Sequence, residues 1–252
     1  MNIVMLVGEG ESSKIVYNSL SKDFEINLII EDTSISKKAF LKRRIKKMGY
    51  LKVFGQILFL IYNKILFKKS KNRINSIKKE NGLISDLYPK EIFKKVASIN
   101  NQETIKILLK NQPDIIIVNG TRIVSKKVLN AIDAVFINIH AGITPEYRGV
   151  HGGYWSLVNK DQNNCGVTVH LVDEGIDTGG VLYQDNIKTN ELDDFNTYPY
   201  LQLSKAIRLV KKAIKDVKSG SVKILEKSDS KSTLYSHPTL FEYIKNRIKG
   251  IK

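Results

Sequence analysis

Short apolar runs alternate with amphipathic stretches along most of this 252-residue chain. Each run has the length and the glycine or polar boundaries of a buried strand, and the stretches between the runs have the apolar period of a helix. A strand, a helix and a second strand joined by short links form a parallel pair with a right-handed crossover. We expect strands at residues 2–7, 26–30, 114–119, 135–139, 166–172 and 181–186, and helices near 12–20, 103–109, 126–132, 154–159 and 193–218.

This order of elements predicts an α/β fold, a Rossmann-like, mostly parallel, twisted sheet with helices on both faces. The chain is 42% apolar and contains no internal repeat and no linker rich in proline or serine. Such a composition is typical of a globular protein with a buried core. We expect one catalytic domain at residues 1–190 and a C-terminal helix and tail at 191–252. This tail is apolar enough to form the subunit contact of a homodimer, through Leu234, Tyr235, Leu240, Phe241, Tyr243 and Ile244.

An insertion at about residues 37–90 interrupts the alternation of strands and helices. Residues 37–79 include fifteen Lys or Arg and no Asp or Glu, and so account for nearly all of the net charge of +16. The apolar part, residues 51–67, is shorter than the roughly 20 residues that cross a bilayer, so we expect helices that do not span one. Three interpretations stay open: packing on the sheet with a solvated basic face, peripheral contact of residues 37–79 with an anionic membrane surface, or contact with polyphosphate or nucleic acid.

Cysteine content and the start of the chain indicate the compartment. The single cysteine, Cys165, excludes an internal disulfide, and its apolar strand predicts a small buried side chain. The first residues lack the basic start of a signal peptide and run into a glycine turn. We therefore expect a cytoplasmic protein.

Three polar residues of complementary chemistry follow two apolar strands. Asn138 and His140 end the strand at 135–139, and residues two apart share one face of a strand. Ligands of open α/β sheets bind beyond the carboxyl ends of the strands. Asp177 follows the next strand in a loop with glycines at 175, 179 and 180, which allow a tight backbone path. A carboxamide can donate to a carbonyl oxygen while a neutral imidazole accepts a proton, so the trio suits an acyl-type transfer.

The motifs around this trio carry a family resemblance. They read Asn138-Ile-His140, Gly-Ile-Thr-Pro-Glu-Tyr-Arg-Gly at 142–149, Gly166-Val-Thr-Val-His170 and Asp173-Glu-Gly-Ile-Asp177-Thr-Gly. In this order and spacing they resemble the folate-dependent formyltransferase superfamily, which includes enzymes that act on glycinamide ribonucleotide, methionyl-tRNA and nucleotide-linked amino sugars. The match covers roughly residues 110–187 and implies the formyltransferase fold.

The resemblance implies that Asn138, His140 and Asp177 are catalytic and that N10-formyltetrahydrofolate is the formyl donor, with no metal. In this family the pterin lies between the segment after one strand and the loop that carries the catalytic carboxylate. Backbone groups there read the pterin edge, with Ile123 as an apolar wall. His170, in a strand, is expected to be structural or to support the site residues from behind. The implied donor-binding residues are Gly120, Thr121, Arg122, Ile123, Val124, Val172, Asp173, Gly175 and Ile176.

The implied reaction begins when a neutral substrate amine attacks the formyl carbon. Asn138 and protonated His140 then donate hydrogen bonds to the developing oxyanion, at about 3 kcal/mol for each well-placed donor. His140, directly or through a water held by Asp177, moves the amine proton to N10.

The acceptor is expected to be a nucleotide-linked amino sugar, formylated for a surface polysaccharide of the O-antigen type. Residues after 186 are too few for the RNA-binding barrel of methionyl-tRNA enzymes, so we expect no nucleic-acid substrate. The acidic loop Gly8-Glu-Gly10-Glu is a poor phosphate cradle, which argues against glycinamide ribonucleotide. Two alternatives stay open: glycinamide ribonucleotide formyltransferase of purine synthesis, and a protein that binds folate or a nucleotide without turnover. Aromatic rings and an arginine suit a sugar diphosphate, so the expected substrate-binding residues are Tyr147, Arg148, Gly149, Tyr154 and Trp155.

Overall fold

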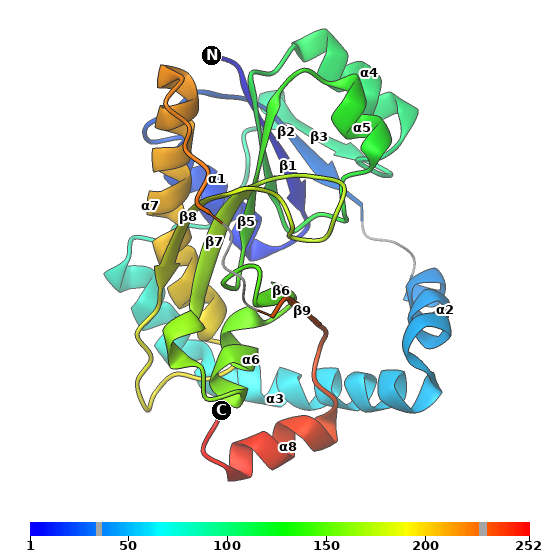
Figure 1. Ribbon diagram of the computed structural model, residues 1–252, viewed down its shortest axis with the longest axis vertical. Coiled ribbons are helices and arrows are strands. Elements are labelled where there is room, and N and C mark those ends of the chain that lie inside the picture. Colours follow the sequence, from blue (N-terminus) through cyan, green and yellow to red (C-terminus); the bar gives the residue numbers. More distant parts are fainter. Residues whose placement is uncertain (34–36, 227–230) are drawn as a thin grey trace.

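The computed structural model describes residues 1–33, 37–226 and 231–252. Its main sheet has the strand order β3-β2-β1-β4-β5-β7-β8 (Figure 1). β7 (Gly166–Leu171) runs antiparallel to β5, and β8 (Val181–Asn186) runs antiparallel to β7. The other five strands are parallel: β1 (Ile3–Gly8), β2 (Ile26–Asp32), β3 (Phe93–Val96), β4 (Ile115–Asn119) and β5 (Val135–His140).

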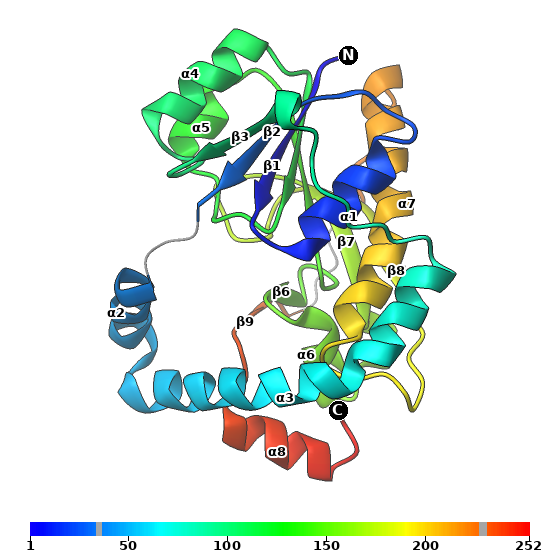
Figure 2. The same ribbon diagram turned by 180° about the vertical axis from the view of Figure 1, so that it is seen from behind.

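Helices cover both faces of this sheet, which confirms the predicted fold class (Figure 2). One face packs against α1 (Glu11–Leu20) and α7 (Tyr198–Ser219), and the other packs against α4 (Gln102–Asn111) and α5 (Lys126–Ala131). Six of the seven strands lie where apolar runs predicted them. The sequence did not predict β3, because this edge strand reads Phe-Lys-Lys-Val and is too short and too charged to give an apolar run.

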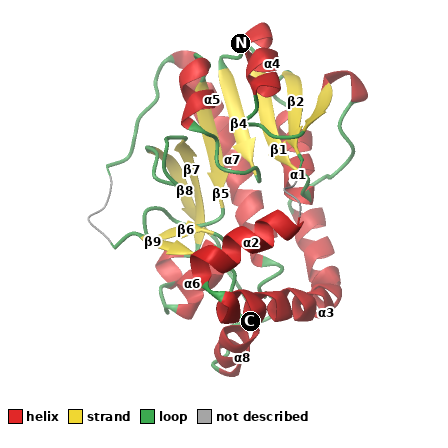
Figure 3. Cartoon of the chain, turned by 90° about the vertical axis from the view of Figure 1, so that its right-hand side faces the viewer, coloured by secondary structure: helices red, strands yellow, loops and turns green. Residues whose placement is uncertain are grey.

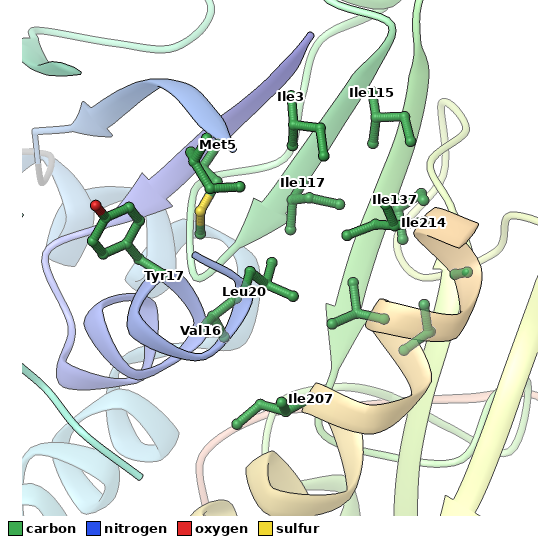
Figure 4. Close-up of a cluster of buried hydrophobic side chains, with 14 of the residues drawn as sticks. Ile3, Met5, Val16, Tyr17, Leu20, Ile115, Ile117, Ile137, Ile207 and Ile214 are labelled. Atoms are coloured by element: carbon green, nitrogen blue, oxygen red, sulfur yellow. The ribbon is translucent and has the colours of Figure 1, made fainter. Parts of the chain in front are cut away.

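Strand alternation distributes the core over the two faces. Ile3 and Met5 of β1 point toward α1 and α7, whereas Val4 and Leu6 point toward α4 and α5. Figure 4 shows the first of these clusters, in which Ile214 of α7 lies beside the strand residues. α7, within the predicted C-terminal segment of residues 191–252, therefore contributes to the core of the main sheet.

The insertion is helical, as predicted. α2 (Lys37–Met48) and α3 (Tyr50–Glu80) form an L-shaped arm at one end of the molecule (Figure 1). α3 packs against α8 (Leu240–Ile248) through an aromatic cluster in which Phe59 contacts Phe195 and Tyr243. The chain then returns through a single 3-10 turn, η1 (Lys90–Ile92), into β3.

A second, two-stranded sheet joins the end of the chain to the middle. β6 (Tyr147–Gly149) pairs in parallel with β9 (Thr233–Tyr235) (Figure 3). The following residues contact the start of α6 (Gly152–Val158): Trp155 Nε1 donates to Ser236 O at 2.9 Å, and His151 Nε2 lies 2.9 Å from His237 Nδ1. A short 3-10 turn, η2 (Gln162–Asn164), leads from α6 to β7.

The tail residues proposed for a subunit contact divide into two groups. Tyr243 is fully buried within the chain, whereas Phe241 is 77% exposed and Ile244 is 42% exposed. A homodimer contact through the exposed members remains a prediction.

The His151–His237 pair predicts a loss of stability in mild acid. Burial lowers the pKa of His151 to about 3 and that of His237 to about 4, from an ordinary value of 6.5. Between pH 6.5 and 4 the unfolded chain binds more protons than the folded chain, so stability is complete above this window and falls as the pH decreases. Each histidine contributes up to about 1.4 kcal/mol per pH unit.

Thermal unfolding between pH 7 and 4 measures this effect. In a His237→Asn variant, the unfolding temperature should fall less steeply with pH, because one of the buried histidines with a lowered pKa is gone. An identical pH slope in the two proteins would contradict the assignment.

Candidate active site

β5, β7 and the loop after β7 bring four polar side chains together at the carboxyl end of the sheet. Asn138 lies directly opposite His170 in the antiparallel pair, and Asn138 Nδ2 is 3.0 Å from His170 Nε2. Asp177 Oδ1 is 3.5 Å from Asn138 Nδ2, and Asp177 Oδ2 is 3.3 Å from His140 Nδ1. The structure thus brings the predicted trio together and adds His170 to it.

His140 is buried between two acceptors. Its Nε2 lies 2.7 Å from the Tyr147 carbonyl oxygen, and its Nδ1 faces Asp177. Burial lowers the pKa of His140, and the Asp177 carboxylate opposes that shift. A neutral imidazole has one N–H and can donate to only one of these acceptors, so its other nitrogen carries no proton and can accept one.

A glycine permits this arrangement. A Cβ at Gly142 would lie 2.4 Å from the Tyr147 carbonyl oxygen and 2.8 Å from His140 Nε2. Any side chain there would push the carbonyl and the imidazole apart. Gly142 O also accepts from Thr168 Oγ1 at 2.7 Å, so β7 fixes the loop that follows β5.

Asp177 is held as a carboxylate. Burial by itself would raise the pKa of Asp177, but its polar contacts, among them the backbone N–H of Gly149, outweigh burial and lower it. The Gly149 N–H donates to Oδ2 at 2.9 Å. The side chain is held from three elements, and its backbone adopts the left-handed conformation with φ of +53°.

His170 orients the Asn138 carboxamide. His170 Nδ1 is 2.6 Å from the Leu171 carbonyl oxygen, so Nδ1 carries the proton in the neutral ring and Nε2 accepts from Asn138 Nδ2. The sequence predicted a structural or supporting residue here without naming its partner. The signal that could have identified it is the antiparallel register, which places residue 170 directly across from residue 138.

A cavity of about 260 Å³ opens in front of these residues. Asn138, His170 and Asp177 line it, whereas His140 lies behind Asp177. Its walls are the segment after β4 and the loop after β7. Among the lining residues are all nine that the resemblance implied for donor binding: Gly120, Thr121, Arg122, Ile123, Val124, Val172, Asp173, Gly175 and Ile176.

Arg122 fixes one wall of the cavity. Its Nε lies 2.7 Å from Asp32 Oδ2, and its backbone N–H donates to the same oxygen at 3.2 Å. Its Nη2 also donates to Thr33 O. Because Asp32 ends β2 and is buried, this pair ties the cavity wall to a neighbouring strand. The guanidinium therefore bonds to other groups of the protein, although Arg122 lines the cavity.

The five predicted acceptor-binding residues divide into two groups. Gly149 lines the cavity, and Arg148 Nη1 donates to the Ile176 carbonyl oxygen at 3.1 Å, linking β6 to the loop that carries Asp177. The three aromatic residues lie elsewhere. Tyr147 and Trp155 each stack on Tyr235, and Tyr154 is buried in the aromatic cluster of α3 and α8.

A family model described as formyl transferase matches residues 35–204, more than half of the chain. The chain belongs to the formyl transferase family. Curated relatives of this formyltransferase include the methionyl-tRNA formyltransferase of Finegoldia magna, 39% identical over 92 residues that cover 36% of this chain and 29% of the relative. The corresponding protein of Caldanaerobacter subterraneus is 28% identical over 165 residues, 61% of this chain and 53% of the relative. The chain thus spans about half or less of the length of these relatives.

Solved structures share the fold at low sequence identity. A sugar N-formyltransferase from Shewanella matches with a TM-score of 0.57 and 16% identity, over 93% of this chain and 76% of that one. The sugar 3N-formyl transferase WlaRD, solved in the presence of dTDP and 5-N-formyl-THF, matches with a TM-score of 0.55 and 15% identity, over 93% of this chain and 69% of that one. Phosphoribosylglycinamide formyltransferase from Streptococcus pneumoniae matches with a TM-score of 0.55 and 18% identity, over 86% of this chain and 99% of that one.

The formyltransferase site combines hydrogen-bond donors, a base and a carboxylate around a partly apolar cavity. This set suits transfer of a carbonyl group between nitrogen atoms. Within the described ranges no group of three or more His, Cys, Asp or Glu side chains is arranged to hold a metal ion. The cavity is lined by apolar side chains and glycine backbone together with a few polar side chains, which is typical of a small-molecule site.

The Arg122–Asp32 pair predicts a large loss of stability when one partner is removed. Arg122→Ala leaves the Asp32 carboxylate buried and short of donors, so the free energy of unfolding should fall by about 2–4 kcal/mol. A matched control is Lys126→Ala, which removes an exposed ion pair with Glu174 and should cost less than about 0.5 kcal/mol. Urea denaturation measures both. Equal losses in the two variants would show that Arg122 has no special role.

Proposed function

We propose that this formyltransferase transfers the formyl group of N10-formyltetrahydrofolate to the amine of a nucleotide-linked amino sugar. The observation that carries the proposal is the convergence of Asn138, His140 and Asp177 at a cavity whose two walls are the segments implied for pterin binding. Formyl transfer is the chemistry of the family. The donor and the acceptor are the proposed parts.

The cavity fits one end of the donor. Val118, Val124 and Val172 give it apolar walls, and its loops present backbone N–H and C=O groups to the edge of a heterocycle. When bound, the donor supplies the formyl carbon and the nitrogen that leaves. Among the residues that line this cavity, Asn138 and Asp177 are the polar side chains of the trio, so we place the formyl group beside them.

Asn138 would hold the formyl oxygen. One of its two N–H groups donates to His170 Nε2, and the other has only the long 3.5 Å contact with Asp177. That second N–H can turn to the carbonyl oxygen as negative charge develops on it. His170 keeps the carboxamide in the donating orientation.

Asp177 and His140 would handle the amine proton. Asp177 lines the cavity and lies between it and His140, so it can hold the incoming amine or a water molecule. His140 is neutral because burial lowers its pKa, and its free nitrogen can accept the proton through that water. The imidazolium that forms is stabilised by the adjacent carboxylate and would return the proton, through the same water, to the donor nitrogen as it leaves.

One consideration supports a sugar acceptor over glycinamide ribonucleotide. The solved structures do not separate the two, because sugar formyltransferases and phosphoribosylglycinamide formyltransferases align with 93% and 92% of this chain and share only its fold. The loop after β1 carries Glu9 and Glu11, which pair with Lys95 and Lys78. Glu11 lies in the first turn of α1, so the helix end that would attract a phosphate already has an anion beside it.

Methionyl-tRNA is a second candidate acceptor, with its own observations. The curated relatives described above are methionyl-tRNA formyltransferases, and the arm of α2 and α3 has the positive charge that would attract a nucleic acid.

A direct assay separates the acceptors: the purified chain with N10-formyltetrahydrofolate and, in turn, nucleotide-linked amino sugars, glycinamide ribonucleotide and methionyl-tRNA. Release of tetrahydrofolate with an amino sugar alone supports the proposal, and release with tRNA alone overturns the sugar assignment.

The catalytic roles predict the effects of two substitutions. Asn138→Ala should lower kcat by about 10²–10³-fold, because one donor to the developing oxyanion is lost. His140→Ala should lower it by about 10²–10⁴-fold. Asn186→Ala, at the exposed end of β8, is a matched control and should leave the rate unchanged.

The pH profile is a second readout of His140. Because burial lowers its pKa, activity should persist below pH 6.5 and fall only at lower pH, where the imidazole becomes protonated. This decrease in activity at low pH should be absent from the residual activity of the His140→Ala variant. Full activity in either alanine variant would contradict the assigned roles.

A further inference from the structure

The outward face of α3 carries a continuous apolar stripe. At 100° per residue its members fall within about 100° of the helix circumference, and the stripe extends for about 22 Å along the axis. Each side chain is between 37% and 84% exposed. The members of this stripe are Tyr50, Leu51, Phe54, Leu58, Ile61 and Ile65.

The opposite face of α3 is already bound to the rest of the chain. Val53, Phe59 and Ile77 on that face are buried. Polar contacts fix the same side: Asn63 exchanges two hydrogen bonds with Asn196, and Arg73 Nε lies 2.8 Å from Asp193 Oδ1. The helix therefore cannot turn its stripe inward. It is apolar on two opposite faces, of which only one has a partner within the described part of the chain.

Cations surround the stripe. α2 exposes Lys38, Lys42 and Lys46 on one side. Leu41, 37% exposed, borders this side, whereas Phe40, 48% exposed, lies on the opposite one. On α3, Lys68 and Lys69 follow the last stripe residue on the same side of the helix. The segment of residues 37–79 contains no acidic residue at all. An apolar stripe edged by cations is the pattern of a helix that lies in a membrane interface.

A lipid surface fits these features better than the other occupants. A second copy of the chain would bring two sets of fifteen cations together, and the two would repel each other. A nucleic acid would satisfy the cations but would leave six large apolar side chains in water. By length and composition α3 is apolar enough to cross a membrane. Its inner face, however, is bonded to Asp193 and Asn196 and could not be surrounded by lipid.

We propose that α2 and α3 dock on an anionic lipid surface, with α3 lying flat and its stripe below the headgroups. The lipid phosphates would pair with the lysines and arginines of residues 37–79. α8 lies beside α3 at the same end of the molecule and exposes Phe241 and Ile248, which could extend the contact (Figures 1 and 2). The opposite side of α2, which carries Phe40, Arg43 and Lys47, borders a groove with Thr121 and Ile123.

Vesicle flotation tests the proposal, with phosphatidylcholine vesicles and with vesicles that also contain phosphatidylglycerol. The unaltered chain should float only with the anionic vesicles, and high salt should weaken the binding. Combined Leu51→Ser, Ile61→Ser and Ile65→Ser should weaken it by about 10-fold or more. Combined Lys38→Glu, Lys42→Glu and Lys46→Glu should weaken it by about 100-fold or more.

Matched controls lie outside the arm. Ile84→Ser, Leu87→Ser and Leu109→Ser remove three other exposed apolar side chains, and Lys110→Glu, Lys218→Glu and Lys223→Glu reverse three other exposed charges. Both control sets should bind as the unaltered chain does. Thermal unfolding checks that every variant is folded.

Three outcomes would overturn the proposal. The first is no flotation with anionic vesicles at low salt. The second is flotation that the stripe variant does not weaken. The third is a dimer in solution that the stripe variant dissociates, which would assign the stripe to a second copy. Retention of RNA that depends on the arm lysines, without vesicle binding, would assign the arm to a nucleic acid.

Discussion

The site depends on the contacts of one side chain, the Asp177 carboxylate. It accepts the N–H of Gly149, faces His140 on one oxygen and lies near His170 and Asn138 on the other. These contacts join β5, β6 and the loop after β7, three segments that are separate in the sequence. A carboxylate can do this while buried because hydrogen bonds and imidazoles lower its pKa and keep it ionised.

The rest of the fold positions this carboxylate and its partners. β5, in the parallel part of the sheet, ends at His140. The antiparallel β7 places His170 opposite Asn138. Arg122 ties the facing wall to β2 through Asp32. The end of the chain adds a further layer, because β9 pairs with β6 and Tyr235 stacks on Tyr147 and Trp155. The surroundings of β6 are therefore built partly by residues outside the segment of the family match.

The sequence predicted the parts of this arrangement that are encoded locally. Apolar runs gave six strands, and the two motifs around Asn138 and Asp177 identified the residues that meet at the cavity. The rest depends on pairing between distant segments. No local pattern relates Tyr147 to Tyr235 or Tyr154 to Tyr243, so aromatic residues that suit a sugar in sequence were found packed against the C-terminal segment. His170 was missed as a site residue for the same reason, since its partner is fixed by strand register.

The central claim is that the cavity between residues 120–124 and 172–177 holds the formyl donor with its formyl group at Asn138. The most direct measurement is a crystal structure with 5-formyltetrahydrofolate, a stable relative of the proposed donor. We expect the heterocycle between these two segments and a polar atom of the ligand within hydrogen-bond distance of the Asn138 carboxamide. A ligand bound outside this cavity, or one whose reactive end lies away from Asn138 and Asp177, would contradict it.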